Sequence, residues 1–414
     1  MELKRVVVTG LGALTPIGNT YKEYWDALKK GTSGANMITH FDASKFKTQF
    51  ACEVKGFDPK EHFDRKEVRK LDLFSQYAMV VAKEAFENAK LEGNYNPDRV
   101  GVVWGSGIGG LQTFQNECFD FAKGDGTPRF NPFFIPKMIA DIASGHISIK
   151  YGLRGPNYTT VSACASSTNA IIDSFNLIRL GKADVMVTGG SEAAVNEAGM
   201  GGFNALHALS TNNENYQTAS RPFDKTRDGF VLGEGAGCLI LEEYEHAKAR
   251  GAEIFCEVVG GGMSADAHHI TAPHPEGLGA TNVMVNALDD ANMKPEEVDY
   301  INVHGTSTPL GDISESQAIK RVFGDHAFNL NISSTKSMTG HLLGAAGAIE
   351  ALACIMAITD GVVPPTINFE HPDDDIDQDL NFTFNKAQER KVKVALSNTF
   401  GFGGHNTSAI FKAI

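Results

Sequence analysis

The sequence predicts an α/β fold, and three features of the chain carry that prediction. Short runs of β-branched residues alternate with longer segments that have the composition of helices. Most of the short runs end on glycine, as expected where a strand meets a tight turn. The chain has 414 residues, of which 42% are hydrophobic, so it can bury a large core and form more than one domain-sized unit.

Four runs predict buried strands, and three segments predict helices. The strands are expected at residues 5–10, 99–107, 184–190 and 238–244, where apolar residues follow one another. The helices are expected at residues 23–31, 76–90 and 167–181. The first and last of these helices stop at Gly31 and Gly181, because glycine favours the backbone conformation that ends a helix.

Segments of the first part of the chain resemble segments of the second part, which indicates an internal duplication. Residues 96–110 and 294–311 each combine a proline-containing turn, a strand and a glycine-rich loop. A polar loop opens a helix of small residues at 161–175 and again at 335–351, and residues 237–243 and 407–413 are closing strands. A boundary is expected near residues 250–256. Chance similarity among glycine-rich α/β segments explains this pattern equally well.

Composition excludes several classes of function. The net charge of −13 argues against non-specific nucleic-acid binding. The first ten residues have no apolar run long enough for a signal peptide, and residues 345–358 fall short of the roughly 20 that a spanning helix needs. The six cysteines are scattered and form no C-x-x-C pair. We therefore expect a soluble protein of a reducing cytoplasm, with no membrane or nucleic-acid partner.

Cys164 lies among small residues in "VSACASS" and is a candidate nucleophile. A free thiol has a pKa of about 8.5, so an acyl-transfer nucleophile needs help to react. If the helix begins at Cys164, its N-terminal dipole favours a thiolate. Packing is the alternative, because free cysteine is among the most buried residue types, and we assign that role to the other five cysteines.

Two histidines and a lysine supply candidate partners for the thiol. His304 follows an expected strand, and Lys336 and His341 share a segment that leads into a helix. The duplication places both histidines at one centre, although a lone histidine in such a place is more often structural. Glycines alternate with Phe400 and Phe402 in residues 398–406, where tight backbone turns can expose N–H groups as an oxyanion hole does. A plain turn is the alternative there, and His268, His269 and His274 have no metal-ligand spacing.

Together these motifs resemble those of the β-ketoacyl-acyl carrier protein synthases, most closely the bacterial elongating type II enzymes. "VSACASS", "HGTSTPLGD", "KSMTGHLLGAAG" and "GFGGHN" occur in that order, and the resemblance runs from "KRVVVTGLGALTPIGN" to "AIFK". It implies the thiolase fold, a five-layered α-β-α-β-α sandwich of two similarly folded halves, here residues 1–253 and 254–414. It also implies a homodimer.

The resemblance implies a decarboxylative Claisen condensation in which each site residue has a role. Cys164 accepts the acyl group, and the backbone N–H groups of Cys164 and Phe402 hold the oxyanion. His304 and His341 donate hydrogen bonds to the enolate left when malonyl-carrier protein loses carbon dioxide, and Lys336 holds the His341 loop. Thr306 and Thr308 bind the phosphopantetheine arm. Phe402 is a gate between the cysteine and the acyl pocket, Ile108 lines that pocket, and Phe400 is a further substrate-binding residue.

The resemblance also implies an acidic carrier protein as partner and no required cofactor. The carrier protein would bind Lys66, Arg69 and Lys70, which share a face if residues 64–70 are helical, together with Arg129. Phe130 and His207 stand where basic residues are frequent in the family. A structural monovalent cation is implied at Asn302, Glu350, Ser397 and Asn398.

Other functions of this fold class fit the sequence less well. A thiolase would use a second cysteine near the C-terminus, where this chain has "GFGGHN", and a starter-unit synthase would use Cys-His-Asn. A catalytically inactive chain-length partner would lack Cys164. A dinucleotide-binding enzyme would need a third glycine in "TGLGALTPIGN".

Overall fold

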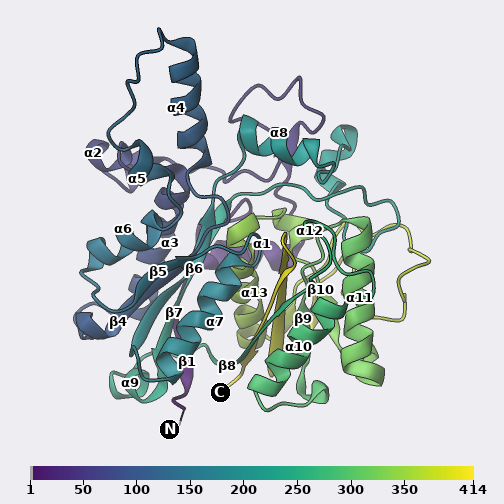
Figure 1. Cartoon of the computed structure of the whole chain (residues 1–414). Helices are drawn as coiled ribbons and strands as arrows, with labels where there is room; N and C mark the ends of the chain where they lie inside the picture. Colours follow the sequence, from purple (N-terminus) through teal and green to yellow (C-terminus); the bar gives the residue numbers. More distant parts are fainter. Residues whose placement is uncertain (1–2) are drawn as a thin grey trace.

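A computed structural model describes residues 3–414, and its main sheet has two five-stranded halves with one strand order (Figure 1). The first half runs β5-β4-β6-β7-β1 and the second runs β10-β9-β13-β14-β8. If the five strands of each half are numbered 1 to 5 in the order in which they occur along the chain, both halves have the spatial order 3-2-4-5-1. The directions match too, because β4 is parallel to β5 and β6, and β9 is parallel to β10 and β13, while the remaining neighbours within each half are antiparallel. The internal duplication is therefore real.

The two halves of the sheet are joined where β1 pairs with β8 over three residue pairs. The strands of the first half are β1 (Val6–Leu14), β4 (Val100–Gly105), β5 (Asn157–Thr160), β6 (Val185–Glu192) and β7 (Gly235–Glu243). Those of the second half are β8 (Cys256–Ala265), β9 (Tyr300–Asn302), β10 (Asn331–Ser333), β13 (Val394–Gly401) and β14 (His405–Lys412).

Three layers of helices separate and cover the two halves of the sheet, which gives the expected five layers. The outer layers are α3 (Leu73–Ala89) with α6 (Ile142–Tyr151), and α10 (Leu278–Asp290) with α11 (Pro309–Phe323). The central layer is α7 (Ser166–Arg179) and α13 (Ala346–Asp360), which contact each other and strands of both halves. Alternate strand residues face different layers: Met186 joins the central core, while Val185 and Val187 join the core beneath α3. A third core lies beneath α10 and α11.

The predicted elements are confirmed, with shifted ends. The four expected strands are β1, β4, β6 and β7, and the three expected helices are α1 (Tyr21–Lys30), α3 and α7. Gly31 ends α1 in the left-handed conformation, with φ of 70°. The segments of the predicted repeat also correspond, since β4 and β9 are the second strands of their halves and β7 and β14 are the fifth.

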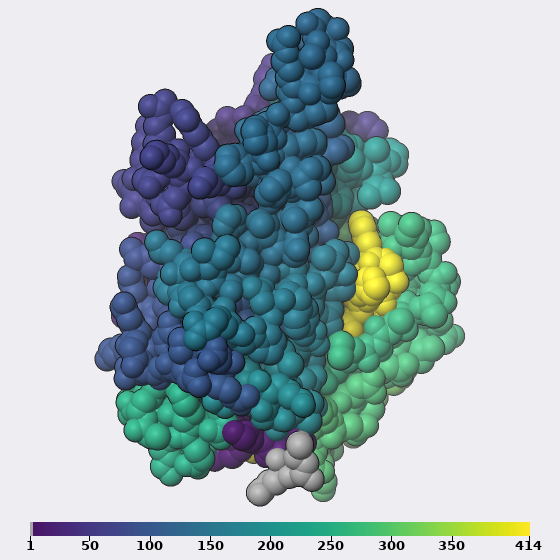
Figure 2. Space-filling model, turned by 60° about the vertical axis from the view of Figure 1, so that its left-hand side comes forward, coloured from purple at the N-terminus to yellow at the C-terminus, as the bar shows by residue number. Residues whose placement is uncertain are grey.

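Several elements extend beyond the repeated layers and form a cap opposite the chain termini (Figure 1). They include α2 (Arg65–Val68), α4 (Leu111–Lys123), α5 (Phe134–Met138) and α8 (Glu197–Ala205). Figure 2 shows the α4 segment rising above the rest of the surface. Smaller elements complete the chain: α9 (Tyr244–Ala249), α12 (Lys336–Thr339), and the strands β2 (Asn36–Met37), β3 (Phe50–Ala51), β11 (Val362–Val363) and β12 (Gln388–Glu389).

One helical stretch, Leu343–Asp360, is long and apolar enough to cross a membrane by composition alone. It contains α13, and 83% of the stretch is buried inside the protein. Its apolar character is explained by its place in the central layer, where it contacts strands on both sides.

Candidate active site

Cys164 lies in a tight turn between β5 and α7, which corrects the prediction that it occupies the first turn of the helix. The helix begins at Ser166, with Ala165 as its N-cap. Ala163 has a φ of 51°, a conformation that non-glycine residues rarely adopt. The Ser166 hydroxyl closes the turn, because it accepts from the Ser162 amide at 3.0 Å and donates to the Ala163 carbonyl at 2.6 Å. Small residues alone do not mark where this turn ends and the helix begins.

The thiol of Cys164 is buried against His341. The distance from its Sγ to His341 Nε2 is 3.0 Å. Burial raises the pKa of the thiol to about 12, although the Lys336 charge and the Phe402 backbone amide both act to lower the pKa. Burial therefore opposes the thiolate that the helix start was expected to favour, while Lys336 and Phe402 act in the opposite direction.

His304 and His341 lie side by side, and both are neutral imidazoles near neutral pH. Their ring centroids are 5.3 Å apart and the rings are nearly perpendicular. Burial lowers both pKa values well below the ordinary value, and the Lys336 charge lowers them further. Each ring has a buried Nδ1 with no hydrogen-bond partner among the residues described. A proton on Nδ1 would be a buried donor without a partner, so we assign the ring proton to Nε2 in each case.

Lys336 lies behind the two histidines rather than at the cavity wall. Its side chain is buried and forms an ion pair with Glu350. The Lys336 carbonyl accepts a hydrogen bond from Ser220 Oγ at 2.7 Å. The charge of Lys336 acts through space on Cys164, His304 and His341.

One cavity of about 620 Å³ brings most of the predicted site residues together. The predicted residues that line it are Cys164, His304, His341, Ile108, Thr306, Thr308, Phe400 and Phe402. The Thr306 and Thr308 hydroxyls are 3.0 Å apart. Phe402 lies in a loop of β13 and β14 that closely approaches the Cys164 turn, where a Cβ on Gly401 would lie 2.6 Å from the Ser162 carbonyl oxygen and 3.1 Å from the Cys164 amide nitrogen.

Two buried carboxylates hold the loops of this cavity, and the sequence analysis missed both. Glu192 accepts hydrogen bonds from the amides of Gly107, Ile108, Gly109 and Gly344 at 2.7–3.3 Å. Glu315 accepts from the amides of His304 and Gly305 at 2.9 and 2.8 Å. Burial raises the pKa of Glu315 to about 7 and also raises that of Glu192. An acidic residue beside apolar residues of a strand or helix is the only sequence signal for such a role.

The predicted basic patch lies outside the cavity, and its helix is shorter than expected. α2 covers only Arg65–Val68, so Arg69 is its C-cap and Lys70 follows it. The helix cannot continue, because Asp72 adopts an extended conformation to cap α3. Lys66, Arg69, Lys70 and Arg129 are all exposed. Phe130 is exposed beside Arg129, and His207 lines the cavity entrance with Leu206.

Two of the residues implied for a monovalent cation have buried oxygens without partners. Asn302 and Ser397 are register partners on β9 and β13, and neither Asn302 Oδ1 nor Ser397 Oγ has a hydrogen-bond partner within the described chain. The Asn398 side chain is committed elsewhere, since its amide donates to Glu315 and its oxygen accepts from Ser408. Among residues 3–414, no group of three or more His, Cys, Asp or Glu side chains could hold a metal ion.

Comparison with known proteins identifies close relatives over the full length of the chain. Residues 3–247 match the family model described as the β-ketoacyl synthase N-terminal domain, and residues 255–370 match the C-terminal domain. The chain is 52% identical to 3-oxoacyl-acyl-carrier-protein synthase 2 of Synechocystis sp., covering 100% of this chain and 99% of the relative. It is 51% identical to the protein of the same name from Coxiella burnetii, covering 100% of both.

Solved structures show the same fold at lower sequence identity. A β-ketoacyl synthase from Burkholderia phymatum has a TM-score of 0.92 at 35% identity, covering 99% of this chain and 100% of that one. A ketosynthase solved in complex with its type II acyl-carrier protein and bound to a hexaketide has a TM-score of 0.90 at 35% identity, covering 100% of both chains. The five-layered arrangement is thus shared with proteins of known structure.

Proposed function

The chain belongs to the β-ketoacyl synthase family, and from this premise we infer that it is an elongating 3-oxoacyl-acyl-carrier-protein synthase. It takes an acyl group onto a cysteine and condenses it with a malonyl group on a carrier protein, with loss of carbon dioxide. The product is a β-ketoacyl chain two carbons longer. The residue roles given below are our proposal for how this chain does so.

The observation that carries the proposed roles is the meeting of one thiol and two neutral imidazoles in one cavity. Cys164 Sγ lies 3.0 Å from His341 Nε2, and the His304 ring lies 5.3 Å from the His341 ring. A nucleophilic sulfur within hydrogen-bond distance of an imidazole N–H suits acyl transfer, because the N–H can stabilise the thiolate. Two neutral rings with protons on Nε2 suit the stabilisation of a developing negative charge.

In the first step, Cys164 Sγ attacks the thioester carbonyl of the acyl-loaded carrier protein. A new C–S bond forms as the C–S bond to the carrier breaks, and the carrier thiol takes up the proton that Cys164 loses. The Nε2–H of His341 is close enough to Sγ to donate a hydrogen bond to the developing thiolate. The amides of Cys164 and Phe402 hold the tetrahedral oxyanion. The Phe402 amide supports this role because it lies against the sulfur and acts to lower the pKa of the thiol, which burial raises.

In the second step, the malonyl thioester enters the same cavity and loses carbon dioxide. The electron pair of the broken C–C bond forms an enolate, whose oxygen accepts hydrogen bonds from His304 and His341. The carbanion attacks the acyl carbonyl on Cys164, a C–C bond forms as the C–S bond breaks, and the sulfur leaves as a thiolate that takes up a proton from solvent. Burial keeps both imidazoles neutral before the reaction, and the charge of Lys336 adds to this effect because it disfavours a second positive charge nearby.

The test is Cys164→Ala, which should abolish elongation while the thermal midpoint stays near that of the unmodified protein. Purified enzyme is mixed with malonyl-carrier protein and acyl-carrier proteins of graded chain length, and products are followed by mass spectrometry. Elongation by Cys164→Ala would contradict the proposed nucleophile. Absence of elongation by the unmodified enzyme with every donor would contradict the proposed function itself.

We further propose a homodimer and a carrier-protein site on the cap. β5 is an edge strand, and Val161 beside it and Ile149 on α6 are 61% and 79% exposed, as expected of a face that a second copy covers.

The exposed Lys66, Arg69, Lys70 and Arg129 suit an acidic carrier protein. The loaded arm would pass Thr306 and Thr308 to reach Cys164, and Phe400, Phe402 and Ile108 would shape the acyl pocket.

The proposed chemistry needs no cofactor, and a monovalent cation would have a structural role. Asn302 Oδ1 and Ser397 Oγ fit such an ion because both are buried and unpaired, and Glu350 lies in the helix that covers this face of the sheet. Asn398 could contribute only through its backbone.

The proposed domain division stays at residues 1–253 and 254–414. A cytoplasmic location is supported by the six free cysteines.

A further inference from the structure

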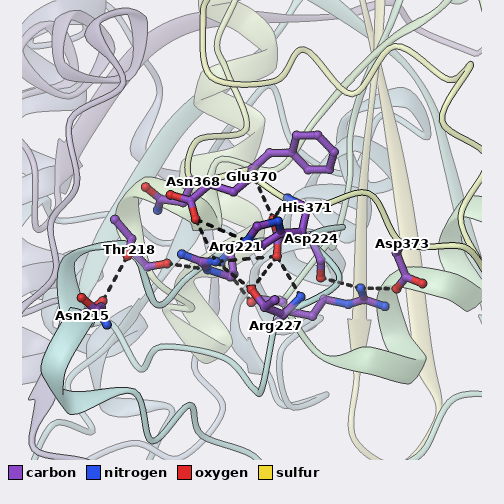
Figure 3. Close-up of polar contacts among 12 residues, drawn as sticks. Asn215, Thr218, Arg221, Asp224, Arg227, Asn368, Glu370, His371 and Asp373 are labelled. Carbon is purple, nitrogen blue, oxygen red and sulfur yellow. Dashed lines mark hydrogen bonds and ion pairs between the residues drawn. The ribbon is translucent and has the colours of Figure 1, made fainter.

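Arg227 is a buried arginine whose contacts lead to the cavity without lining it. Its side chain is 2% exposed, and it lies in the loop between η3 (Asn213–Thr218) and β7, within the polar network of Figure 3. The guanidinium donates to the carbonyls of Thr308, Pro309 and Asp224 at 3.3, 2.8 and 2.7 Å. It also contacts the carboxylates of Asp312 and Asp373 at 3.3 and 2.5 Å.

The carbonyls that Arg227 holds belong to the turn that presents Thr306 and Thr308. Thr308 is the N-cap of α11, yet its hydroxyl does not cap the helix and instead faces the Thr306 hydroxyl. Ser307 between them has a φ of 68°, which is unfavourable for a serine. This turn therefore needs support from outside, because an unsatisfied cap and a strained residue do not hold a helix start in place.

The Arg227 loop supplies that support along its whole length. The Arg221 amide donates to Ser307 Oγ at 3.0 Å, and the Gly229 amide donates to the Ser307 carbonyl at 3.1 Å. Asp312, which Arg227 contacts, accepts from the Ser307 amide at 3.2 Å. Within this loop, the Arg227 guanidinium contacts three parts of the structure. It binds the turn at Thr308, the start of α11 at Pro309 and the C-terminal segment at Asp373.

The same loop continues to the histidine that contacts the nucleophile. Gly229 and Phe230 line the cavity, and the Phe230 ring is 5.3 Å from the His341 ring. The His341 amide donates to the Val231 carbonyl at 2.8 Å. Asp224 anchors the other end of the loop by accepting from the amides of Glu370 and His371, both at 2.7 Å (Figure 3).

We propose that Arg227 is a positioning residue for the phosphopantetheine arm of the carrier-protein substrates, acting through the Thr306–Thr308 turn. This inference rests on the proposed function, because the turn has this role only if the substrates are carried on such an arm. The guanidinium fixes the backbone of Thr308 and Pro309, so that the two threonine hydroxyls point into the cavity at a fixed spacing. Substrate affinity should then depend on Arg227 much more than the chemical step does.

Arg227→Lys tests the proposal, because lysine keeps the charge and loses the planar fork that reaches three carbonyls. We expect KM for malonyl-carrier protein and for free malonyl-pantetheine to rise about tenfold, as for the loss of one or two hydrogen bonds to a charged group. We expect kcat to change less than about threefold. Alkylation of Cys164 by iodoacetamide, which has no arm, should keep its rate.

Arg221→Lys is the matched control. Arg221 is a neighbouring buried arginine of the same loop, and its side chain contacts Thr218, Thr226, Asp224 and Glu370 but no residue of the Thr306–Thr308 turn. Its KM values should stay within about twofold of wild type. Equal rises in KM for Arg227→Lys and Arg221→Lys would overturn the proposal, as would an Arg227→Lys effect confined to kcat.

A double-mutant cycle with Thr308→Val tests whether Arg227 affects substrate binding through the Thr306–Thr308 turn. If Arg227 acts through this turn, Arg227→Lys should raise KM much less in the Thr308→Val background than in the wild type. If the fold-change in KM of the double variant equals the product of the fold-changes of the two single variants, the proposal is overturned. If Arg227→Lys fails to fold, Asp373→Asn removes one of its partners, and the same rise in KM, smaller in size, is expected. Failure of the unmodified enzyme to elongate would instead refute the proposed function.

Discussion

The two halves of the chain share one strand order and bring different chemistry to the same cavity. Before α7, the first half places a thiol in a turn where Ala163 has a φ of 51°. Before α13, the second half places an imidazole, and Leu343 has a φ of 48°. The fold thus determines where a side chain enters the cavity, and the residue at that place determines what it does. The comparison predicts a division of labour, with the nucleophile supplied by the first half and the stabilisation of the enolate by the second.

The loops that follow β4 and β9 extend this comparison. Both are held by a buried carboxylate that accepts backbone amides, Glu192 for the Ile108 loop and Glu315 for the His304 loop. The carboxylates come from different places, since Glu192 ends β6 and Glu315 lies within α11. Anchoring of the two loops is therefore similar in chemistry, although the anchors do not occupy matching positions.

The largest expected effect comes from removing a histidine of the second half. His304→Ala and His341→Ala should each slow malonyl decarboxylation by about 10²- to 10³-fold, because each removes a donor to the enolate oxygen. Acylation of Cys164 should be less affected in both, and least in His304→Ala, since only His341 contacts the sulfur. Release of labelled carbon dioxide is measured beside single-turnover acylation. Equal losses in both steps would contradict the division of labour.

The seam between the halves should be sensitive to added volume, because its helices pack closely. A Cβ on Gly347 of α13 would lie 1.9 Å from Thr168 Oγ1 of α7, whereas a Cβ on Gly202 of α8 would meet nothing within 4 Å. Gly347→Ala should lower the free energy of unfolding by about 1–3 kcal/mol, while Gly202→Ala should raise it by about 0.5–1 kcal/mol. Urea denaturation measures both. Equal stability of the two variants would mean that the central helices are not closely packed there.

The sequence predicted four strands of the first half, the repeated segments of the second half and several residues that line the cavity, because apolar runs and short motifs record local structure. It could not predict that Cys164 precedes α7, since the turn depends on hydrogen bonds of Ser166 and on the approach of Gly401. The carboxylates of Glu192 and Glu315 escaped notice for a similar reason. The amide partners of Glu192 are up to 152 positions away in the chain, and those of Glu315 are 10 and 11 positions away on the loop before its helix, so neither set of contacts leaves a pattern in the immediate sequence.

Replacing the anchoring carboxylates sharpens the comparison of the two loops, with an expected effect of about tenfold on rate. Glu315→Gln should slow decarboxylation, because an amide offers one acceptor where the carboxylate offers two to His304 and Gly305. Glu192→Gln should instead reduce transfer of long acyl chains, because Ile108 lines the cavity and is proposed to shape the acyl pocket. Acyl-length profiles and decarboxylation rates are measured for both variants. The same profile for both would contradict separate roles for the loops.

The pH dependence of stability checks that Glu315 is held as a buried acid. Its pKa is raised from 4.5 in the unfolded chain to about 7 in the folded protein, because burial disfavours the charged form. Between these values the folded state binds more protons than the unfolded state, so the contribution of Glu315 to the free energy of unfolding falls as pH rises. The stability of wild type relative to Glu315→Gln should therefore decline from about pH 4.5 to about pH 7 and level off above. A difference that is constant, or that grows with pH, would show that the carboxylate is not buried as described. Because burial also raises the pKa of Glu192, the Glu192→Gln comparison should slope in the same direction.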